Sequence, residues 1–435
     1  MKGNRIIPII FIEMLVAGML LIFIAPKNQV SEAENRRLAK LPELSVKSVF
    51  SGEFASGINS YLNDHFPLRT AFIEAGDNAK ALMSYKGGSE LEVYAGVGGE
   101  DMGVGENLYS KDAQPEPEPE PEKDTVPEAA HIDVPEEADY NRGGIIISGT
   151  RAMELFGYYY NMLVNYAAKV NAIQAAVPGV KVYSLVVPTS VEFYSPVKYH
   201  TGMRSQKDAV ATMYSMLTPG IGTVDAYVYL AAAADQYIYF RTDHHWTARG
   251  AYQGYYAFCK AAGLEPLELE SFPSEMIADN FVGTLYRYTK SQVIKDNPDY
   301  VEVYLPPEIE DCIGYAEYHN GELKVPYDVA ALVDPDENES NKYKVFLGGD
   351  APLFRIITPN KNGRRLLIIR DSYSNAMALF FAANYEEIFL LDPRLLTVDA
   401  GAFCKKYLVT DVLFENYATV LKNDGMASLI TKLGE

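Results

Sequence analysis

From Gly143 onward, short apolar runs alternate with stretches of helical periodicity, and this alternation constrains the fold more than any other feature. The runs typical of strands are residues 144–148, 180–187, 366–370, 387–391 and 412–414. The helical patterns lie at residues 158–176, 206–217 and 247–262. Strands that alternate with helices form a mostly parallel sheet covered by helices on both faces. We therefore expect an α/β domain.

A polar motif, Thr-Asp-His-His-Trp-Thr at residues 242–247, contains two of the six histidines and the only tryptophan. In an extended segment, positions i and i+2 face the same side, so Asp243 and His245 can point into one site. A carboxylate beside an imidazole fixes its tautomer and stabilises its protonated form. Two alternatives stay open: a purely structural pair at a helix entry, or a site that uses His244 while Asp243 caps the following helix.

The motif needs a nucleophile, and Ser372 is the best candidate. It follows an apolar run and precedes a helical pattern, as nucleophilic serines do at strand-to-helix turns. The order Asp, His, Ser also occurs in subtilisin-like triads. A serine in this place is also a common helix N-cap, which is the structural alternative.

Further site residues are expected where strands end, because ligands of open α/β sheets bind at the carboxyl ends of the strands. An oxyanion needs two or three donors; beside the Ser372 N–H, the candidates are Asn416 and Gly349. The pocket candidates are Trp246, Thr189, Ser190 and Tyr373. We expect no metal and no cofactor.

The motif at residues 242–247, with Gly250-Ala251-Tyr252 behind it, resembles the signature of the DHHW protein family. That family is similar to the SGNH-hydrolase-like domain of the alginate O-acetyltransferases. The resemblance extends to residues 31–36, 371–375 and 391–394 and so covers most of the chain. It implies an SGNH-hydrolase-like fold and an O-acyltransferase or esterase that acts on a cell-surface or secreted polysaccharide.

By the same resemblance, Asp243, His245 and Ser372 fall on the Asp, His and Ser of the acetyltransferase triad. One departure is the pair Arg370-Asp371, where the acetyltransferases tend to carry a small residue and Thr. A carboxylate next to the nucleophile would oppose a developing oxyanion if it pointed inward. This favours the alternative of a non-catalytic glycan-binding or assembly protein on the same fold. A third alternative is an adhesion or scaffold protein in which these residues only hold a core.

The N-terminal segment 1–26 is expected to be a membrane anchor, because residues 6–25 form an apolar run long enough to span a bilayer. Lys2 and Arg5 precede the run and place the bulk of the chain outside the cytoplasm. A cleaved signal peptide, leaving a secreted protein, is the alternative. A carboxylate inside the bilayer costs free energy unless it is protonated or paired, so Glu13 within the run indicates a partner helix.

We expect a helical lead segment at residues 27–90 and the SGNH-hydrolase-like domain at residues 91–435. Residues 112–139 carry eleven acidic residues and one lysine and include a Pro-Glu repeat, so they are expected to form a disordered insertion. The stretch 265–343 has weak periodicity, typical of a lid or substrate wall.

Two further features of composition bear on nucleic-acid binding and on the state of the cysteines. The net charge of −20 argues against nucleic acid as a partner. The three widely spaced cysteines match no metal site, and buried free thiols are expected, although one disulfide stays open.

Overall fold

The computed structural model divides the chain into two compact units, Met1–Glu90 and Leu91–Glu435. In the first unit it describes residues 30–31, 36–37, 41–42, 44, 54, 58, 61–62 and 65. In the second it describes residues 127–134, 140–142, 144–199, 205–317, 325–328 and 341–434. The expected membrane anchor lies outside the described residues, and within them no helix combines the length and apolarity needed to cross a bilayer.

The first unit contains one described antiparallel pair of strands, β1 (Val30–Ser31) and β2 (Arg36–Arg37). Near the end of the unit, the His65 N–H donates to the Tyr61 carbonyl at 3.0 Å, as in one turn of helix. The two rings stack with their centroids 4.3 Å apart. The helical lead segment stays a prediction.

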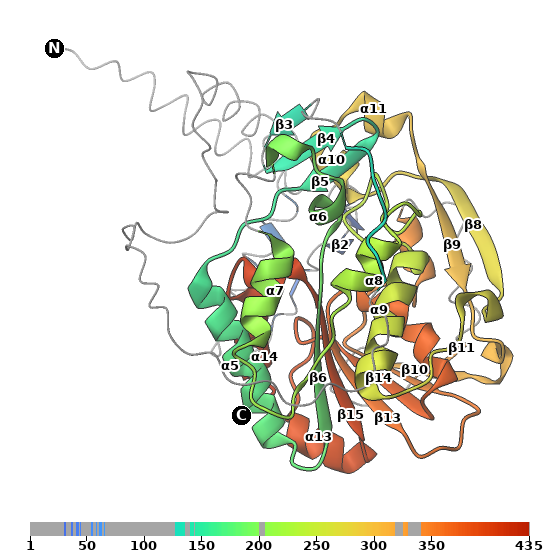
Figure 1. Cartoon of the computed structure of the whole chain (residues 1–435). Coiled ribbons are helices and arrows are strands. Elements are labelled where there is room, and N and C mark those ends of the chain that lie inside the picture. The colour runs from blue at the N-terminus through green and yellow to red at the C-terminus, as the bar shows by residue number, and fades with distance from the viewer. Residues whose placement is uncertain are drawn as a thin grey trace. The chain divides into compact units, whose positions relative to one another are not determined.

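The second unit is built around an eight-stranded sheet in the order β11-β10-β12-β14-β13-β15-β6-β7 (Figure 1). Its strands are β6 (Lys181–Val187), β7 (Gly222–Thr223), β10 (Ile313–Glu317), β11 (Val325–Asp328), β12 (Leu353–Ile357), β13 (Arg365–Arg370), β14 (Glu387–Leu391) and β15 (Asp411–Tyr417). The run from β14 to β7 is parallel, whereas β12, β10 and β11 pair antiparallel. The fold is therefore α/β with a mostly parallel sheet.

Helices cover both faces of this sheet. One face carries α5 (Tyr160–Ala176), α7 (Gln206–Tyr214), α13 (Ala400–Tyr407) and α14 (Gly425–Thr431), and the other carries α8 (Tyr227–Ala232) and α9 (Ala248–Ala262) (Figure 1). Along β13, Leu366 and Ile368 pack on the α9 side, and Leu367 and Ile369 on the α5 side. Burial on both faces explains why this strand is an uninterrupted apolar run.

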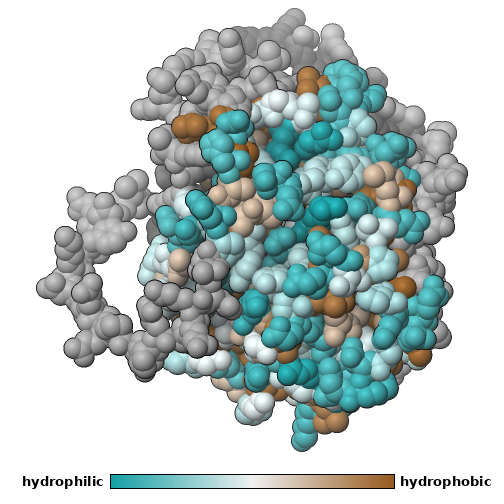
Figure 2. All heavy atoms as spheres, turned by 45° about the vertical axis from the view of Figure 1, so that its right-hand side comes forward, coloured by the Kyte–Doolittle hydropathy of each residue, from teal (hydrophilic) through white to brown (hydrophobic). Residues whose placement is uncertain are grey.

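Smaller elements surround the carboxyl ends of the parallel strands. A three-stranded antiparallel sheet contains β3 (Tyr140–Arg142), β4 (Ile145–Ser148) and β5 (Arg151–Glu154), so the apolar run at residues 144–148 does not join the main sheet. The antiparallel pair β8 (Ser274–Phe281) and β9 (Asp299–Tyr304) is linked through α10 (Thr284–Thr289) and α11 (Gln292–Lys295). After β6 and β13 come the short helices α6 (Ser190–Tyr194) and α12 (Ser374–Met377). Figure 2 shows a mainly hydrophilic surface with small, separate apolar patches.

Part of the expected disordered insertion is ordered against the domain. Residues 127–134 are described, and the Ala130 N–H donates to the Ala231 carbonyl at 2.9 Å. Ala130 and Ile132 pack against the core on the α8 side. The expectation for residues 112–139 therefore needs correction at this end, where alternating small and apolar side chains face the core while Glu128 and Asp133 face solvent.

The three cysteines, Cys259, Cys312 and Cys404, are free and buried. Burial raises the pKa of the Cys259 thiol to about 12 and those of Cys312 and Cys404 to about 11. This agrees with the expectation of buried thiols.

Candidate active site

The motif at residues 242–247 lies at the tip of a tight loop. Tyr239 and Trp246 form an antiparallel bridge, and the Thr247 N–H donates to the Ile238 carbonyl at 3.0 Å. The Thr247 hydroxyl then accepts the Gly250 N–H at 3.3 Å and caps α9. The loop therefore enters a helix as the sequence predicts, and its tip projects residues 241–245.

Three side chains from two distant segments form one hydrogen-bonded chain. The Asp243 Oδ1 atom lies 2.6 Å from His245 Nδ1, and His245 Nε2 lies 2.8 Å from Ser372 Oγ. Ser372 is the second residue after β13, so the carboxyl end of this strand brings the hydroxyl to the loop tip. Asp243 and His245 are buried, whereas Ser372 is partly exposed. Ser372 is thus the most exposed residue of the three.

The ionisation of this chain follows from its surroundings. Burial, together with the nearby His244 imidazole, lowers the pKa of His245 to about 4, against the opposing effect of Asp243. Burial alone would raise the pKa of Asp243, but the two imidazoles and the hydrogen bonds from His245 and Thr284 hold it below its ordinary value. An ionised carboxylate only accepts, so His245 Nδ1 carries the proton and Nε2 accepts from Ser372.

The alternative use of His244 does not match the geometry. Its Nδ1 atom lies 2.7 Å from the Thr284 hydroxyl and 3.6 Å from the nearest Asp243 oxygen. Its ring centroid lies 3.8 Å from that of His245, and its side chain is 24% exposed. His245, not His244, lies between the carboxylate and the serine.

The loop between β8 and α10 holds the carboxylate. The Thr284 N–H and hydroxyl both donate to Asp243 Oδ2, at 2.7 and 2.9 Å. A Cβ added at Gly283 would lie 2.3 Å from the Asp243 Cβ, so only glycine permits this approach. The stretch 265–343, expected to form a lid or wall, therefore supplies the support for Asp243.

A second carboxylate, Asp299 at the start of β9, holds the base of the same loop tip. It is fully buried and accepts the Thr242 N–H at 2.8 Å and the Thr242 hydroxyl at 2.6 Å. Its other oxygen accepts the Arg241 N–H at 3.0 Å and the Arg241 Nε–H at 3.2 Å. Sequence reasoning missed Thr284 and Asp299; a polar residue at a helix start or strand start is too common a signal to single them out.

Asp371, which follows β13 directly, turns away from the Ser372 hydroxyl. Its Oδ1 accepts the Tyr373 N–H at 3.0 Å, and its Oδ2 accepts the Tyr417 N–H at 3.0 Å and the Asn416 amide at 3.3 Å. Burial raises its pKa to about 6, against the lowering effect of these hydrogen bonds and of Arg394. This carboxyl therefore joins the ends of β13 and β15 and does not face the nucleophile.

The expected oxyanion donors differ in their availability. The Asn416 side chain is occupied on both atoms, because its oxygen also accepts the Tyr166 hydroxyl at 2.8 Å. The Gly349 N–H faces the Phe346 carbonyl at 3.4 Å, a long contact, in a left-handed conformation. In the described part of the chain no hydrogen bond is found for the Ser372 N–H. The geometry favours the Ser372 N–H as the oxyanion donor. Asn416 has a structural role.

The four pocket candidates are all buried: Trp246, Thr189, Ser190 and Tyr373. Thr189 exchanges two hydrogen bonds with the Gln206 amide, at 2.8 and 2.9 Å. The Trp246 indole donates to the Tyr373 carbonyl at 2.9 Å, and the Tyr373 hydroxyl donates to the His244 carbonyl. These contacts make Trp246 and Tyr373 braces behind the site.

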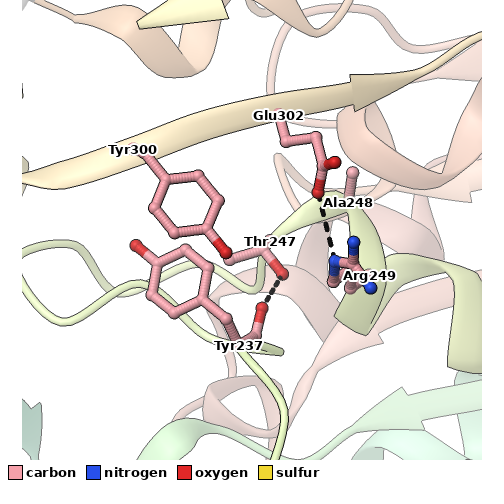
Figure 3. A pocket seen from close by; sticks show the side chains of 6 residues that line it. All are labelled: Tyr237, Thr247, Ala248, Arg249, Tyr300 and Glu302. Atoms are coloured by element: carbon pink, nitrogen blue, oxygen red, sulfur yellow. Dashed lines mark hydrogen bonds and ion pairs between the residues drawn. The ribbon is translucent and has the colours of Figure 1, made fainter. Parts of the chain in front are cut away.

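Two surface hollows lie elsewhere on the molecule, and neither is lined by Asp243, His245 or Ser372. The smaller, of about 160 Å³ including open solvent and too narrow for a water molecule, is lined by Tyr237, Thr247, Ala248, Arg249, Tyr300 and Glu302, with an Arg249–Glu302 ion pair at 3.1 Å (Figure 3). The larger, of about 950 Å³ including open solvent, is lined by residues of α8 and α9 with Pro127 and Glu268.

One group of residues in the described part of the chain has the composition of a metal site. Potential ligand atoms of Asp243, His244 and His245 all lie within 4.8 Å of one another. The ring nitrogens of His245 and the Nδ1 of His244 already face hydrogen-bond partners. Hydrogen bonding accounts for the arrangement without a metal.

Comparisons with known proteins identify the family. Residues 105–391 match the family described as DHHW protein. A DHHW family protein from Eubacterium siraeum is 31% identical over 67% of this chain and 96% of its own, with a TM-score of 0.60. Bacillus cereus PatB1, solved with a sulfonyl adduct, is 17% identical over 66% of this chain and 97% of its own, with a TM-score of 0.55.

Two further comparisons complete these findings. The O-acetyltransferase domain of Pseudomonas putida AlgJ is 13% identical over 63% of this chain and 90% of its own, and its TM-score of 0.36 is too low to support an argument. No curated protein matches the sequence. The family match and the Eubacterium siraeum structure agree, and the chain belongs to the DHHW protein family.

Proposed function

We propose that the protein is an acyl-transfer enzyme, an O-acyltransferase or esterase, whose nucleophile is Ser372. The observation that carries the proposal is the continuous hydrogen-bonded chain from a buried carboxylate to a buried imidazole to a partly exposed hydroxyl. Structural hydrogen bonds alone do not require a serine that is open to solvent at the end of such a chain. The orientation of Asp371 supports the proposal, because its charge faces backbone N–H groups.

In the first half-reaction, His245 Nε2 takes the proton from Ser372 Oγ while the oxygen forms a bond to the acyl carbonyl carbon. The negative charge that develops on the carbonyl oxygen is stabilised by the Ser372 N–H. Asp243 stabilises the imidazolium that forms. The tetrahedral intermediate collapses, the leaving group departs with the proton from His245, and the acyl group remains on Ser372 as an ester.

In the second half-reaction, an acceptor hydroxyl gives its proton to His245 and attacks the acyl-serine carbonyl. The acceptor oxygen bonds to the acyl carbon, which gives a new ester or, with water, the free acid; the bond to Ser372 Oγ breaks, and the serine recovers its proton from His245. A sugar hydroxyl as acceptor makes the enzyme a transferase, and water makes it an esterase. The neutral imidazole that both steps require is supported by the lowered pKa of His245.

A cell-surface or secreted polysaccharide is the proposed substrate. The support is the resemblance of the motif to that of the alginate O-acetyltransferases. The apolar run at residues 6–25, preceded by Lys2 and Arg5, supports a place outside the cytoplasmic membrane. N-terminal sequencing of the mature protein tests the anchor, because a start beyond residue 25 would mean that the segment is removed.

The central experiment is covalent labelling with a fluorophosphonate probe and peptide mapping. Ser372 should be modified in the wild type, and Ser372→Ala and His245→Ala should each lose about 10³-fold or more in turnover of an activated acetyl ester. The double mutant should lose little more, because triad members act as a unit.

Ser190→Ala is the matched control, because Ser190 also comes shortly after a parallel strand, β6, but is buried and lacks the hydrogen bond to His245 that Ser372 makes. It should keep both labelling and turnover. A wild type that is neither labelled nor active, but binds polysaccharide, would make the protein a glycan-binding member of the family.

A further inference from the structure

Tyr343, in the short helix η5 (Lys342–Val345), lies directly on the imidazole of His245. The two ring centroids are 3.8 Å apart and the rings are within 11° of parallel. Tyr343 is 4% exposed, so its ring shields this face of the imidazole from solvent. Neither the motif nor the family resemblance pointed to this residue.

The hydroxyl of the same side chain reaches the nucleophile. Tyr343 Oη donates to the backbone carbonyl of Ser372 at 3.0 Å. One rigid side chain therefore contacts both residues of the His245–Ser372 hydrogen bond. A group in this place limits the rotation of the imidazole and fixes the turn that presents the serine hydroxyl.

The surroundings hold Tyr343 in this position. Phe346 and Phe240 pack edge-on against its ring, with centroid distances of 5.1 and 6.2 Å. Three consecutive residues, Leu347, Gly348 and Gly349, have left-handed backbone conformations with φ of 59°, 69° and 103°. A buried leucine in that region is strained, and such strain persists only where the surrounding structure imposes it.

We propose that Tyr343 is a positioning residue for acyl transfer, which sets the distance and orientation between His245 and Ser372 and keeps water off the imidazole. This inference rests on the proposed function. The charged and titratable groups around the imidazole are Asp243 and His244 of its own loop, Asp350, which precedes β12, and Tyr373, whose ring centroid lies 5.2 Å away. Tyr343 supplies the uncharged cover on the remaining face.

Two variants separate the two contacts. Tyr343→Phe keeps the ring but loses the hydrogen bond to the Ser372 carbonyl, and fluorophosphonate labelling should slow by about 3- to 10-fold with an unchanged pH midpoint. Tyr343→Met keeps an apolar filling but loses the planar stack, and labelling should slow by about 100-fold. Its pH midpoint should rise above that of the wild type, because water that reaches the imidazole weakens the burial that lowers the pKa of His245.

Tyr255→Met is the matched control, because Tyr255 is fully buried and bonds to Asn384 at 2.6 Å, with no contact to the site residues. It should lose stability without a change in the labelling midpoint. Wild-type rate and midpoint in Tyr343→Met, or the same shift in Tyr255→Met, would overturn the inference. If Tyr343→Met does not fold, a wild-type labelling rate in Tyr343→Phe would overturn the inference. A wild type that is not labelled at all would instead refute the proposed function.

Discussion

Asp243 and Thr284, 41 residues apart in the sequence, are joined by two hydrogen bonds to a single carboxylate oxygen. The same threonine hydroxyl lies 2.7 Å from His244 Nδ1. The orientation of the carboxylate is therefore set by the first residue of α10, and this relationship can be tested without altering the triad-like residues.

Thr284→Val should weaken the site while leaving the fold intact. Valine has nearly the same shape as threonine but lacks the hydroxyl, so Asp243 Oδ2 keeps only the hydrogen bond from the backbone N–H of residue 284. We expect the free energy of unfolding to fall by about 0.5–1.5 kcal/mol and labelling of Ser372 to slow by about 3- to 10-fold. Thr289→Val in the same helix, whose hydroxyl donates only to the Leu285 carbonyl, should leave labelling unchanged. Equal labelling in both variants would contradict the role given to Thr284.

Gly283→Ala should displace Asp243. The added methyl group would lie 2.3 Å from the Asp243 Cβ and 2.5 Å from Oδ2, distances that require backbone movement. A shift of about 1 Å is expected to cost about 100-fold in labelling rate. Gly157→Ala is the control, because a Cβ there meets nothing within 4 Å. Wild-type labelling by Gly283→Ala would mean that the loop relaxes without moving the carboxylate.

His244→Ala should move the pH profile in a defined direction. His245 must be neutral to accept the serine proton, so labelling should rise as the pH passes the pKa of about 4. The cationic form of the neighbouring His244 imidazole opposes a second proton on His245. Its removal should raise the pKa of His245 and shift the labelling midpoint to higher pH. A shift to lower pH, or none, would show that His244 does not act on His245 electrostatically.

Asp371→Asn should destabilise the protein and should not raise activity. An asparagine cannot accept from both the Tyr373 and Tyr417 N–H groups, so we expect a loss of about 1–3 kcal/mol at neutral pH. The native carboxyl has a pKa of about 6, above its ordinary 3.8, so the folded state binds more protons between these values.

The raised pKa therefore adds a pH-dependent part to the stability, which is fully present below pH 3.8 and is lost as the pH rises through about 6, whereas the hydrogen bonds from the Tyr373 and Tyr417 N–H groups remain. Unfolding curves across this range should be less pH-dependent in Asp371→Asn, with Glu415→Gln as a control for the neighbouring buried acid. Faster labelling in Asp371→Asn would show that the carboxylate opposes the reaction.

The sheet and the meeting of the three site residues follow from local sequence patterns. The runs that became β6, β13, β14 and β15 are buried on both faces and therefore stand out as apolar segments. Ser372 comes just after the carboxyl end of a strand, where sheet ligands bind. The two-residue spacing lets Asp243 and His245 face the same side. The run at residues 144–148 has the same appearance, and only its partners β3 and β5 assign it to another sheet.

The supports of the site could not be predicted, because they depend on contacts between distant segments. Asp299 and Thr284 lie in a stretch without clear periodicity, and Tyr343 is one of 32 tyrosines. Conversely, Asn416 and Thr189 occupy strand ends that are typical of pocket residues, yet their side chains are bonded to Asp371 and Gln206. A polar residue at a strand end has the same sequence signal in both roles.

The three buried thiols provide a built-in reporter of local opening. Cys259 lies in the α9 side of the core and Cys404 in the α5 side. Since their raised pKa values and burial suppress the thiolate, alkylation requires the surrounding structure to open first. In pulsed alkylation of the native protein, the rates at Cys259 and Cys404 thus report local opening on the two faces of the sheet separately. Equal rates would mean that both layers open in one cooperative event, and unequal rates would identify the layer that opens first.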